Sequence, residues 1–70
     1  MKKEISPVRK ARLLRGLTQL DISFPTGINL SKISMIERGY IIPRPEEKRL
    51  IAMALETTVS EIFPENGNGR

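Results

Sequence analysis

The 70-residue chain contains no cysteine, no histidine and no tryptophan. Without cysteine it can form neither a disulfide nor a thiolate metal site, and without histidine it lacks the usual metal ligand and the usual general base. Its acidic residues cluster only at Glu46 and Glu47, which is too few to build a catalytic triad, dyad or metal site. We therefore expect no enzyme activity, no cofactor, no metal and no small-molecule substrate.

Long apolar runs are also missing. No stretch approaches the ~18 apolar residues of a membrane span, and Lys2 and Lys3 are not followed by the apolar core of a signal peptide. We expect a cytoplasmic protein that does not enter a membrane. The length suits one domain with a small core, which we assign to residues 1–65, and we expect a disordered tail at residues 66–70.

Charge is distributed unevenly along the chain. Residues 1–44 contain nine Lys or Arg and three acidic residues, a net charge of +6, whereas residues 45–70 contain three Lys or Arg and five acidic residues, a net charge of −2. This division suggests one surface turned toward a polyanion and another turned away from it. A solvated basic helix would explain the charge alone equally well.

The segment from Thr18 onward opens like a helix. Thr18 is a suitable N-cap because its side-chain oxygen can accept from the amide of Asp21, whose negative charge also favours the first turn. Leu17 and Ile22 flank this cap at the spacing of a hydrophobic staple. We expect this helix to run from Gln19 to Phe24 or Thr26.

A second helix start follows at Asn29, where Ile28 and Ile33 again have the spacing of a staple. Between the two helices, Gly27 stands where the first must stop, and glycine accepts the left-handed backbone conformation required there. Two starts and one stop within residues 18–37 predict a helix-turn-helix, with its second helix at residues 30–38.

The second helix of this motif has an outward side of distinct character. Taking ~100° per residue, Ile33 and Ile36 define its buried side. The residues that point away are small or reach outward: Ser31, Ser34, Met35 and Arg38, with Leu30 at the N-terminal end. A helix that enters the major groove of DNA needs such side chains, although an ordinary helical hairpin is the alternative.

Three more helices are predicted outside the motif. The first begins after Ser6 as N-cap and ends at Gly16, with one side formed by Val8, Ala11 and Arg12. Another opens on Pro45, and its apolar side is formed by Leu50, Ile51, Ala54 and Leu55. A short last helix over residues 59–63 would close the core.

Several segments together resemble the helix-turn-helix of the Cro and phage-repressor (XRE-like) class of bacterial transcription regulators. These are TQ, Ile22-Ser23, TGIN and ISMIERG, with RKARLLRGLTQ before them and the segment from ERGYIIPRPEEK to the end of the last helix after them. The resemblance covers residues 8–63. It implies an all-α, compact, five-helix lambda-repressor-like domain whose second and third helices form the motif.

The resemblance also implies a function and a set of contacts. Such a regulator binds double-stranded DNA sequence-specifically and represses transcription, either as a homodimer on an inverted repeat or as a monomer that pairs only on DNA. Gln19 would hold a phosphate. The recognition positions would be Asn29, Leu30, Ser31, Lys32 and Met35, and the residues clamping the backbone would be Arg38, Tyr40 and Arg44. Capping alone explains Asn29 at least as well.

In the same family, residues at the positions of Arg12 and Glu37 form a partly buried salt bridge, so we expect these two to be architectural. Leu30 and Met35 stand where a polar reader is common. Direct readout would therefore use apolar contact with thymine methyl groups, with Ser31 and Lys32 making most hydrogen bonds.

Two features of the first motif helix depart from the family. Pro25 cannot donate to the carbonyl of Asp21 and disfavours a helical Phe24, so we expect this helix to be kinked or shortened. Leu20 and Phe24 form an apolar pair on its outer side, which indicates either local packing or a protein contact. The alternative function is therefore a protein-interaction module, such as an antitoxin or anti-repressor component of a mobile-element system, binding its partner through Leu20, Phe24, Ile41 and Ile42.

Overall fold

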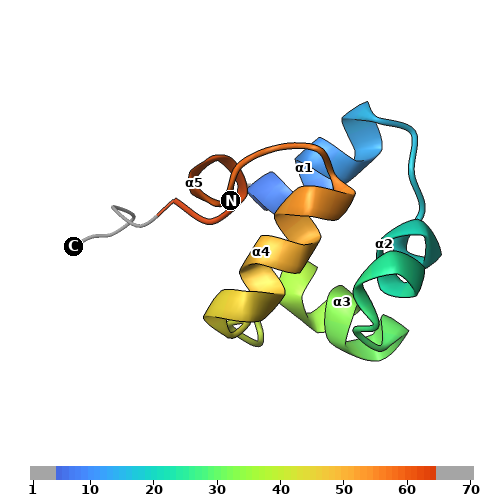
Figure 1. Cartoon of the computed structure of the whole chain (residues 1–70), viewed down its shortest axis with the longest axis vertical. Helices are drawn as coiled ribbons and strands as arrows, with labels where there is room; N and C mark the ends of the chain where they lie inside the picture. Colours follow the sequence, from blue (N-terminus) through green and yellow to red (C-terminus); the bar gives the residue numbers. More distant parts are fainter. Residues whose placement is uncertain (1–4, 65–70) are drawn as a thin grey trace.

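The computed structural model describes residues 5–64, which form α-helices and no β-strand. The helices are α1 (Pro7–Leu14), α2 (Gln19–Thr26), α3 (Leu30–Glu37), α4 (Pro45–Ala54) and α5 (Val59–Ile62). The all-helical class and the order of five helices are confirmed (Figure 1). The predicted tail at residues 66–70 lies outside the described residues.

The starts of the helices follow from local capping. In four helices a side-chain oxygen of the N-cap accepts a backbone N–H three residues later; these N-caps are Ser6, Thr18, Asn29 and Thr58. The start of α4 is held differently, because the backbone N–H of Arg44 donates to Oε1 of Glu47 over 2.9 Å. Each cap satisfies a backbone group that the helix itself leaves without a partner.

The turn between α2 and α3 is held by glycine and by two side-chain hydroxyls. Gly27 has a φ of 73°, in the left-handed region that lacks a steric penalty only for glycine. The hydroxyl of Ser23 donates to the carbonyl of Ile28 over 2.6 Å, and the backbone N–H of Ile28 donates to Oγ1 of Thr26 over 3.2 Å. These bonds fix the direction in which α3 leaves the turn.

Shortening of α2 at Pro25, one of the two effects expected, is not observed, and the helix reaches the later of its two predicted ends. The helix continues through Pro25 to Thr26, and the N–H of Gly27 still donates to the carbonyl of Ser23 over 2.9 Å. Pro25 lies in the last turn, where its missing N–H removes a single helical hydrogen bond. The hydroxyl of Thr26 also donates to the carbonyl of Ile22 over 2.7 Å, so that carbonyl has a side-chain partner.

The core is formed where α4 crosses the middle of the bundle (Figure 1). α2 packs against both α3 and α4, whereas α5 packs against α1 and α4. The buried apolar side chains come from every helix and from the turn before α3: Val8, Ile22, Ile28, Ile33, Ile36, Ile51, Ala52, Leu55 and Ile62. The side of α4 predicted to be apolar is partly wrong, because Leu50 is exposed and Ala52 is buried instead.

Within residues 5–64, none of the helices has the length and apolar character required to cross a membrane. α2 and α3 lie together on the side of the bundle away from α5, and this arrangement places the turn and the start of α3 at its edge (Figure 1).

Candidate nucleic-acid interface

The N-terminal end of α3 is open to solvent. Ile33 and Ile36 are buried as predicted, and Ser31 on the opposite side is exposed. Leu30 and Met35 are also exposed, with exposed fractions of 43% and 40%. The outward side predicted from the sequence is therefore present as a free surface of small and apolar side chains.

Asn29 begins this surface as the N-cap of α3. Its Oδ1 accepts the backbone N–H of Lys32 over 3.2 Å, as the capping pattern predicted. The side chain is exposed, so its amide N–H groups face solvent. Capping and contact with a ligand are therefore compatible in this residue.

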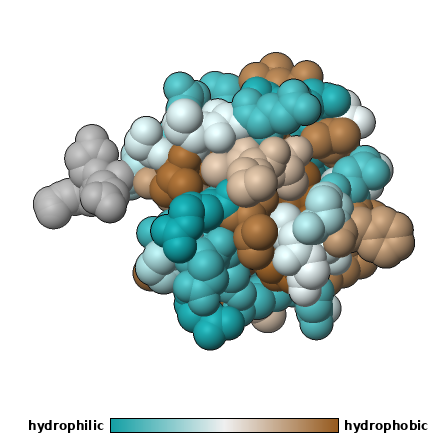
Figure 2. Space-filling model, in the orientation of Figure 1, coloured by the Kyte–Doolittle hydropathy of each residue, from teal (hydrophilic) through white to brown (hydrophobic). Residues whose placement is uncertain are grey.

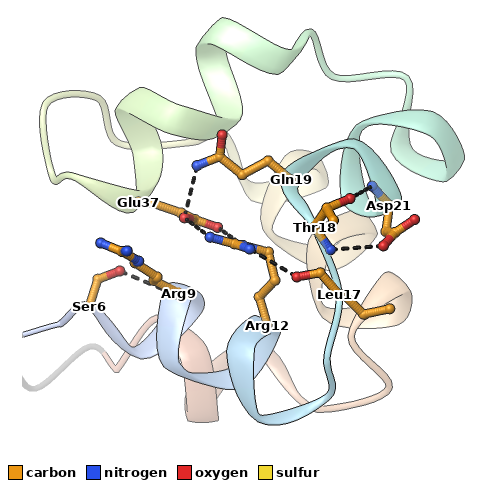
Figure 3. Close-up of polar contacts among 8 residues, drawn as sticks. All are labelled: Ser6, Arg9, Arg12, Leu17, Thr18, Gln19, Asp21 and Glu37. Atoms are coloured by element: carbon orange, nitrogen blue, oxygen red, sulfur yellow. Dashed lines mark hydrogen bonds and ion pairs between the residues drawn. The ribbon is translucent and has the colours of Figure 1, made fainter.

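The C-terminal end of α3 is fixed to α1 by a buried ion pair (Figure 3). Nε of Arg12 donates to Oε2 of Glu37 over 2.7 Å and Nη2 donates to Oε1 over 3.0 Å, which is a bidentate arrangement. A third donor, Nη1, bonds the carbonyl of Leu17 over 2.9 Å. The hydrogen bonds from Arg12 to Glu37 raise the pKa of Arg12 above its usual high value.

This pair confirms the predicted salt bridge, and it is almost completely buried, with side-chain exposures of 9% for Arg12 and 2% for Glu37. Burial without compensation would be unfavourable, but every oxygen of Glu37 has a donor. Its role is to hold α3 against α1, as expected for an architectural contact.

Gln19 joins the same network from the start of α2. Its Nε2 donates to Oε1 of Glu37 over 3.1 Å, and the side chain is half-buried (Figure 3). The backbone of this helix start is fixed by Thr18 and Asp21, because Thr18 Oγ1 accepts from Asp21 N–H and Thr18 N–H donates to Asp21 Oδ2. The predicted phosphate-binding residue therefore donates one amide hydrogen to a buried carboxylate.

Lys32, predicted as a recognition residue, points toward α4. Its Nζ donates to Oε2 of Glu47 over 2.9 Å, and Nη2 of Arg44 lies 3.8 Å from the same oxygen. The hydrogen bonds from Lys32 and from the backbone of Arg44 lower the pKa of Glu47. Lys32 thus differs from its neighbours Leu30 and Ser31, which face solvent.

The segment between α3 and α4 carries the remaining predicted residues. The sequence predicted Arg38 as the last residue of this helix. In the structure α3 ends at Glu37, and Arg38 is its C-cap. Its guanidinium lies 5.8 Å from the centre of the Tyr40 ring, within the range of a cation–π contact. Tyr40 and Arg44 are also exposed, and Nη2 of Arg44 lies 3.8 Å from Oε2 of Glu47.

One basic residue was missed in the sequence. Arg9 on α1 and Arg38 line a polar hollow of about 300 Å³, whose other walls are formed by Arg12, Gln19, Ser34 and Glu37. Neither Arg9 nor Arg38 forms an ion pair within residues 5–64, so both charges are uncompensated there. The position of Arg9 three residues before Arg12, on the same side of a predicted helix, was the available signal.

The outer side of α2 exposes the predicted apolar pair. Phe24 has an exposed fraction of 84%, and Leu20 is also exposed. The visible face of the molecule shows such apolar side chains interspersed with hydrophilic ones (Figure 2).

The described part of the chain holds no group of three or more acidic, histidine or cysteine residues that could bind a metal ion.

A short helix fixed at its C-terminal end, with its N-terminal end exposed and arginines beside it, is the architecture of a helix-turn-helix DNA-binding protein. A family model described as helix-turn-helix matches residues 8–62. The chain therefore belongs to this family, the helix-turn-helix regulators of the Cro and phage-repressor type, and is a DNA-binding transcription regulator. Comparison with curated proteins and with solved structures gave no match.

Proposed function

We propose that this regulator binds one double-stranded DNA sequence specifically and represses transcription by occupying a promoter or operator. The observation that carries the proposal is the exposed outward side of α3, which includes Ser31 near its N-terminal end and Met35, with the exposed Arg38 following as the C-cap. Small and apolar side chains at this end suit contact with base edges and thymine methyl groups.

Each predicted contact has a physical basis. Asn29 and Ser31 supply hydrogen-bonding groups, and Leu30 and Met35 supply apolar contact. Gln19 has a second amide hydrogen that can reach a phosphate while the first remains on Glu37.

Phosphate contacts beside α3 are proposed for Arg38, Tyr40 and Arg44, and Arg9 is added to them from the hollow that it shares with Arg38. Lys32, which the sequence predicts among the recognition positions, is left out of the proposed contacts because its ammonium donates to Oε2 of Glu47 over 2.9 Å.

We also propose that two copies bind an inverted repeat in the cytoplasm of a bacterial or phage-infected cell. Recognition helices of a symmetric pair enter successive major grooves, so the half-sites would be centred about one helical turn apart. A footprint that covers a single half-site, with one copy of the chain bound, would contradict this arrangement.

The test is selection of bound duplexes from a random pool by the full chain, followed by binding measurements over a range of salt concentrations. Arg38→Ala should weaken binding to all duplexes and reduce the slope of log affinity against log salt by about one. Ser31→Ala should instead change which duplexes are preferred. Arg15→Ala and Ser60→Ala are matched controls on exposed residues of the α1 end and of α5. Equal binding to every duplex would contradict sequence-specific recognition.

A protein-interaction module remains the second candidate, because the α2 pair is so exposed. If Leu20 and Phe24 bind a partner or a second copy, Leu20→Ser combined with Phe24→Ser should abolish that complex without loss of helical content. Light scattering of the wild type and the double variant would measure the change. An unchanged mass, with DNA binding retained, would favour the DNA-binding function alone.

A further inference from the structure

The start of α3 contains one side chain that does not share the orientation of its neighbours. Lys32 lies in the first turn, immediately after the exposed Ser31, but its side chain is only 34% exposed. The ammonium is 2.9 Å from a carboxylate oxygen of Glu47, whose own side chain is 10% exposed. The positive charge in the first turn of α3 is therefore directed toward α4.

Both oxygens of Glu47 are engaged. Oε2 accepts from Lys32, and Oε1 accepts the backbone N–H of Arg44 at the start of α4 over 2.9 Å. The guanidinium of Arg44 lies 3.8 Å from Oε2. One carboxylate thus connects the reading end of α3 with the segment that carries a predicted phosphate contact.

These contacts make it energetically unfavourable for the Lys32 ammonium to contact DNA. To reach a base or a phosphate, the ammonium would have to leave a charge-assisted hydrogen bond, and the largely buried carboxylate would lose a partner. The carboxylate would also repel the DNA backbone. Leu30, Ser31 and Met35 meet no such barrier because they are already exposed.

We propose that Glu47 is a positioning residue that keeps Lys32 away from DNA, so that α3 reads bases without an added charge at its tip. This inference rests on the proposed DNA-binding function. A cation released at this point would contact phosphates of any sequence, which raises non-specific binding more than specific binding. Glu47 therefore determines specificity without touching DNA.

The experiment compares wild type with Glu47→Gln in the full chain, using the selected duplex and an unrelated duplex of equal length. The glutamine keeps an acceptor for the N–H of Arg44 but removes the charge that holds Lys32. Glu47→Gln should steepen the slope of log affinity against log salt by about one. Affinity for the unrelated duplex should rise roughly tenfold near 0.1 M salt, and the ratio of specific to non-specific affinity should fall.

Two further variants separate positioning from general effects. Lys32→Met should leave the wild-type slope unchanged, and Glu47→Gln combined with Lys32→Met should return the slope to the wild-type value. Glu46→Gln is the matched control, because Glu46 is an exposed acid in the same helical turn and its loss changes the net charge equally. Circular dichroism and thermal unfolding would verify that all variants are folded.

The outcomes are distinct. A flatter slope in Lys32→Met would mean that Lys32 leaves Glu47 to contact DNA, and this would overturn the inference. A wild-type slope in folded Glu47→Gln, or an equal change in Glu46→Gln, would overturn it as well. If the wild type binds DNA and its affinity falls in Arg38→Ala, these outcomes refute only the role of Glu47. If the wild type binds no duplex, the proposed DNA-binding function is refuted as well.

Discussion

The two ends of α3 are both held by ion pairs, and the pairs differ in burial and in number of contacts. At the C-terminal end, Glu37 accepts two hydrogen bonds from Arg12 and one from Gln19, with 2% of its side chain exposed. At the N-terminal end, Lys32 makes one hydrogen bond to Glu47 and remains 34% exposed. α3 is therefore held more firmly at its C-terminal end, against α1, than at its N-terminal end, which is the end proposed to meet DNA.

Burial decides what each pair contributes. A buried, fully hydrogen-bonded pair adds little net stability, but removal of one member leaves the other charged group without a partner in a poorly solvated site. A pair that is partly exposed is screened by water and contributes less than ~1 kcal/mol in most proteins. Substitutions at the two ends should consequently lower the free energy of unfolding by different amounts.

The largest effect is expected from Glu37→Ala. It leaves the guanidinium of Arg12 buried without its carboxylate, and we expect the free energy of unfolding to fall by about 3 to 5 kcal/mol. Urea denaturation followed by circular dichroism would measure the loss. Arg12→Met combined with Glu37→Leu should recover much of it, because the remaining charge is removed as well. If Glu37→Ala lowers the free energy of unfolding by less than ~1 kcal/mol, the buried pair would contribute no more than the partly exposed one.

A smaller effect is expected from Lys32→Met at the other end. Glu47 keeps the N–H of Arg44 and the nearby guanidinium, and water reaches the vacated position, so the loss should be about 1 kcal/mol or less. The same denaturation experiment would measure it. A loss as large as that of Glu37→Ala would show that the N-terminal pair is also a structural anchor.

The smallest effect is expected in the pH dependence of Glu47. Because its pKa is lowered in the folded state by Lys32 and by the N–H of Arg44, it stabilises the fold above the ordinary glutamate pKa of 4.5. That contribution is lost as the pH falls through the lower pKa of the folded state. The stability difference between wild type and Glu47→Gln should be constant near neutral pH and should shrink in acid. A difference that grows on acidification would contradict the assigned direction.

Local features of the sequence were sufficient to place the helices. Caps such as Thr18 and Asn29 act within three residues, and staples within five, so their positions depend little on the rest of the fold. Pro25 does not shorten α2, which loses only the one hydrogen bond that the missing N–H would have donated to Asp21.

Contacts between distant segments could not be predicted in the same way. The partner of Lys32 lies 15 positions away on α4, and the sequence alone does not show which side of α3 faces that helix. The exposure of Leu50 has the same origin, because Leu50 and Ala52 both flank the buried Ile51 and only the packing of α4 chooses between them. Arg12 and Glu37 were predicted through the family resemblance rather than from spacing.

The turn at Gly27 restricts how the DNA sequence preferred by such a regulator can change during evolution. The hydroxyls of Ser23 and Thr26 both bind the backbone of Ile28, directly after this glycine, and so fix the rotation of α3 about its axis. One inserted or deleted residue would shift the register of α3 by about 100°, which turns Ile33 away from the core. New operator preferences should therefore arise in descendants by exchange of side chains at Leu30, Ser31 and Met35, with the length of the turn preserved.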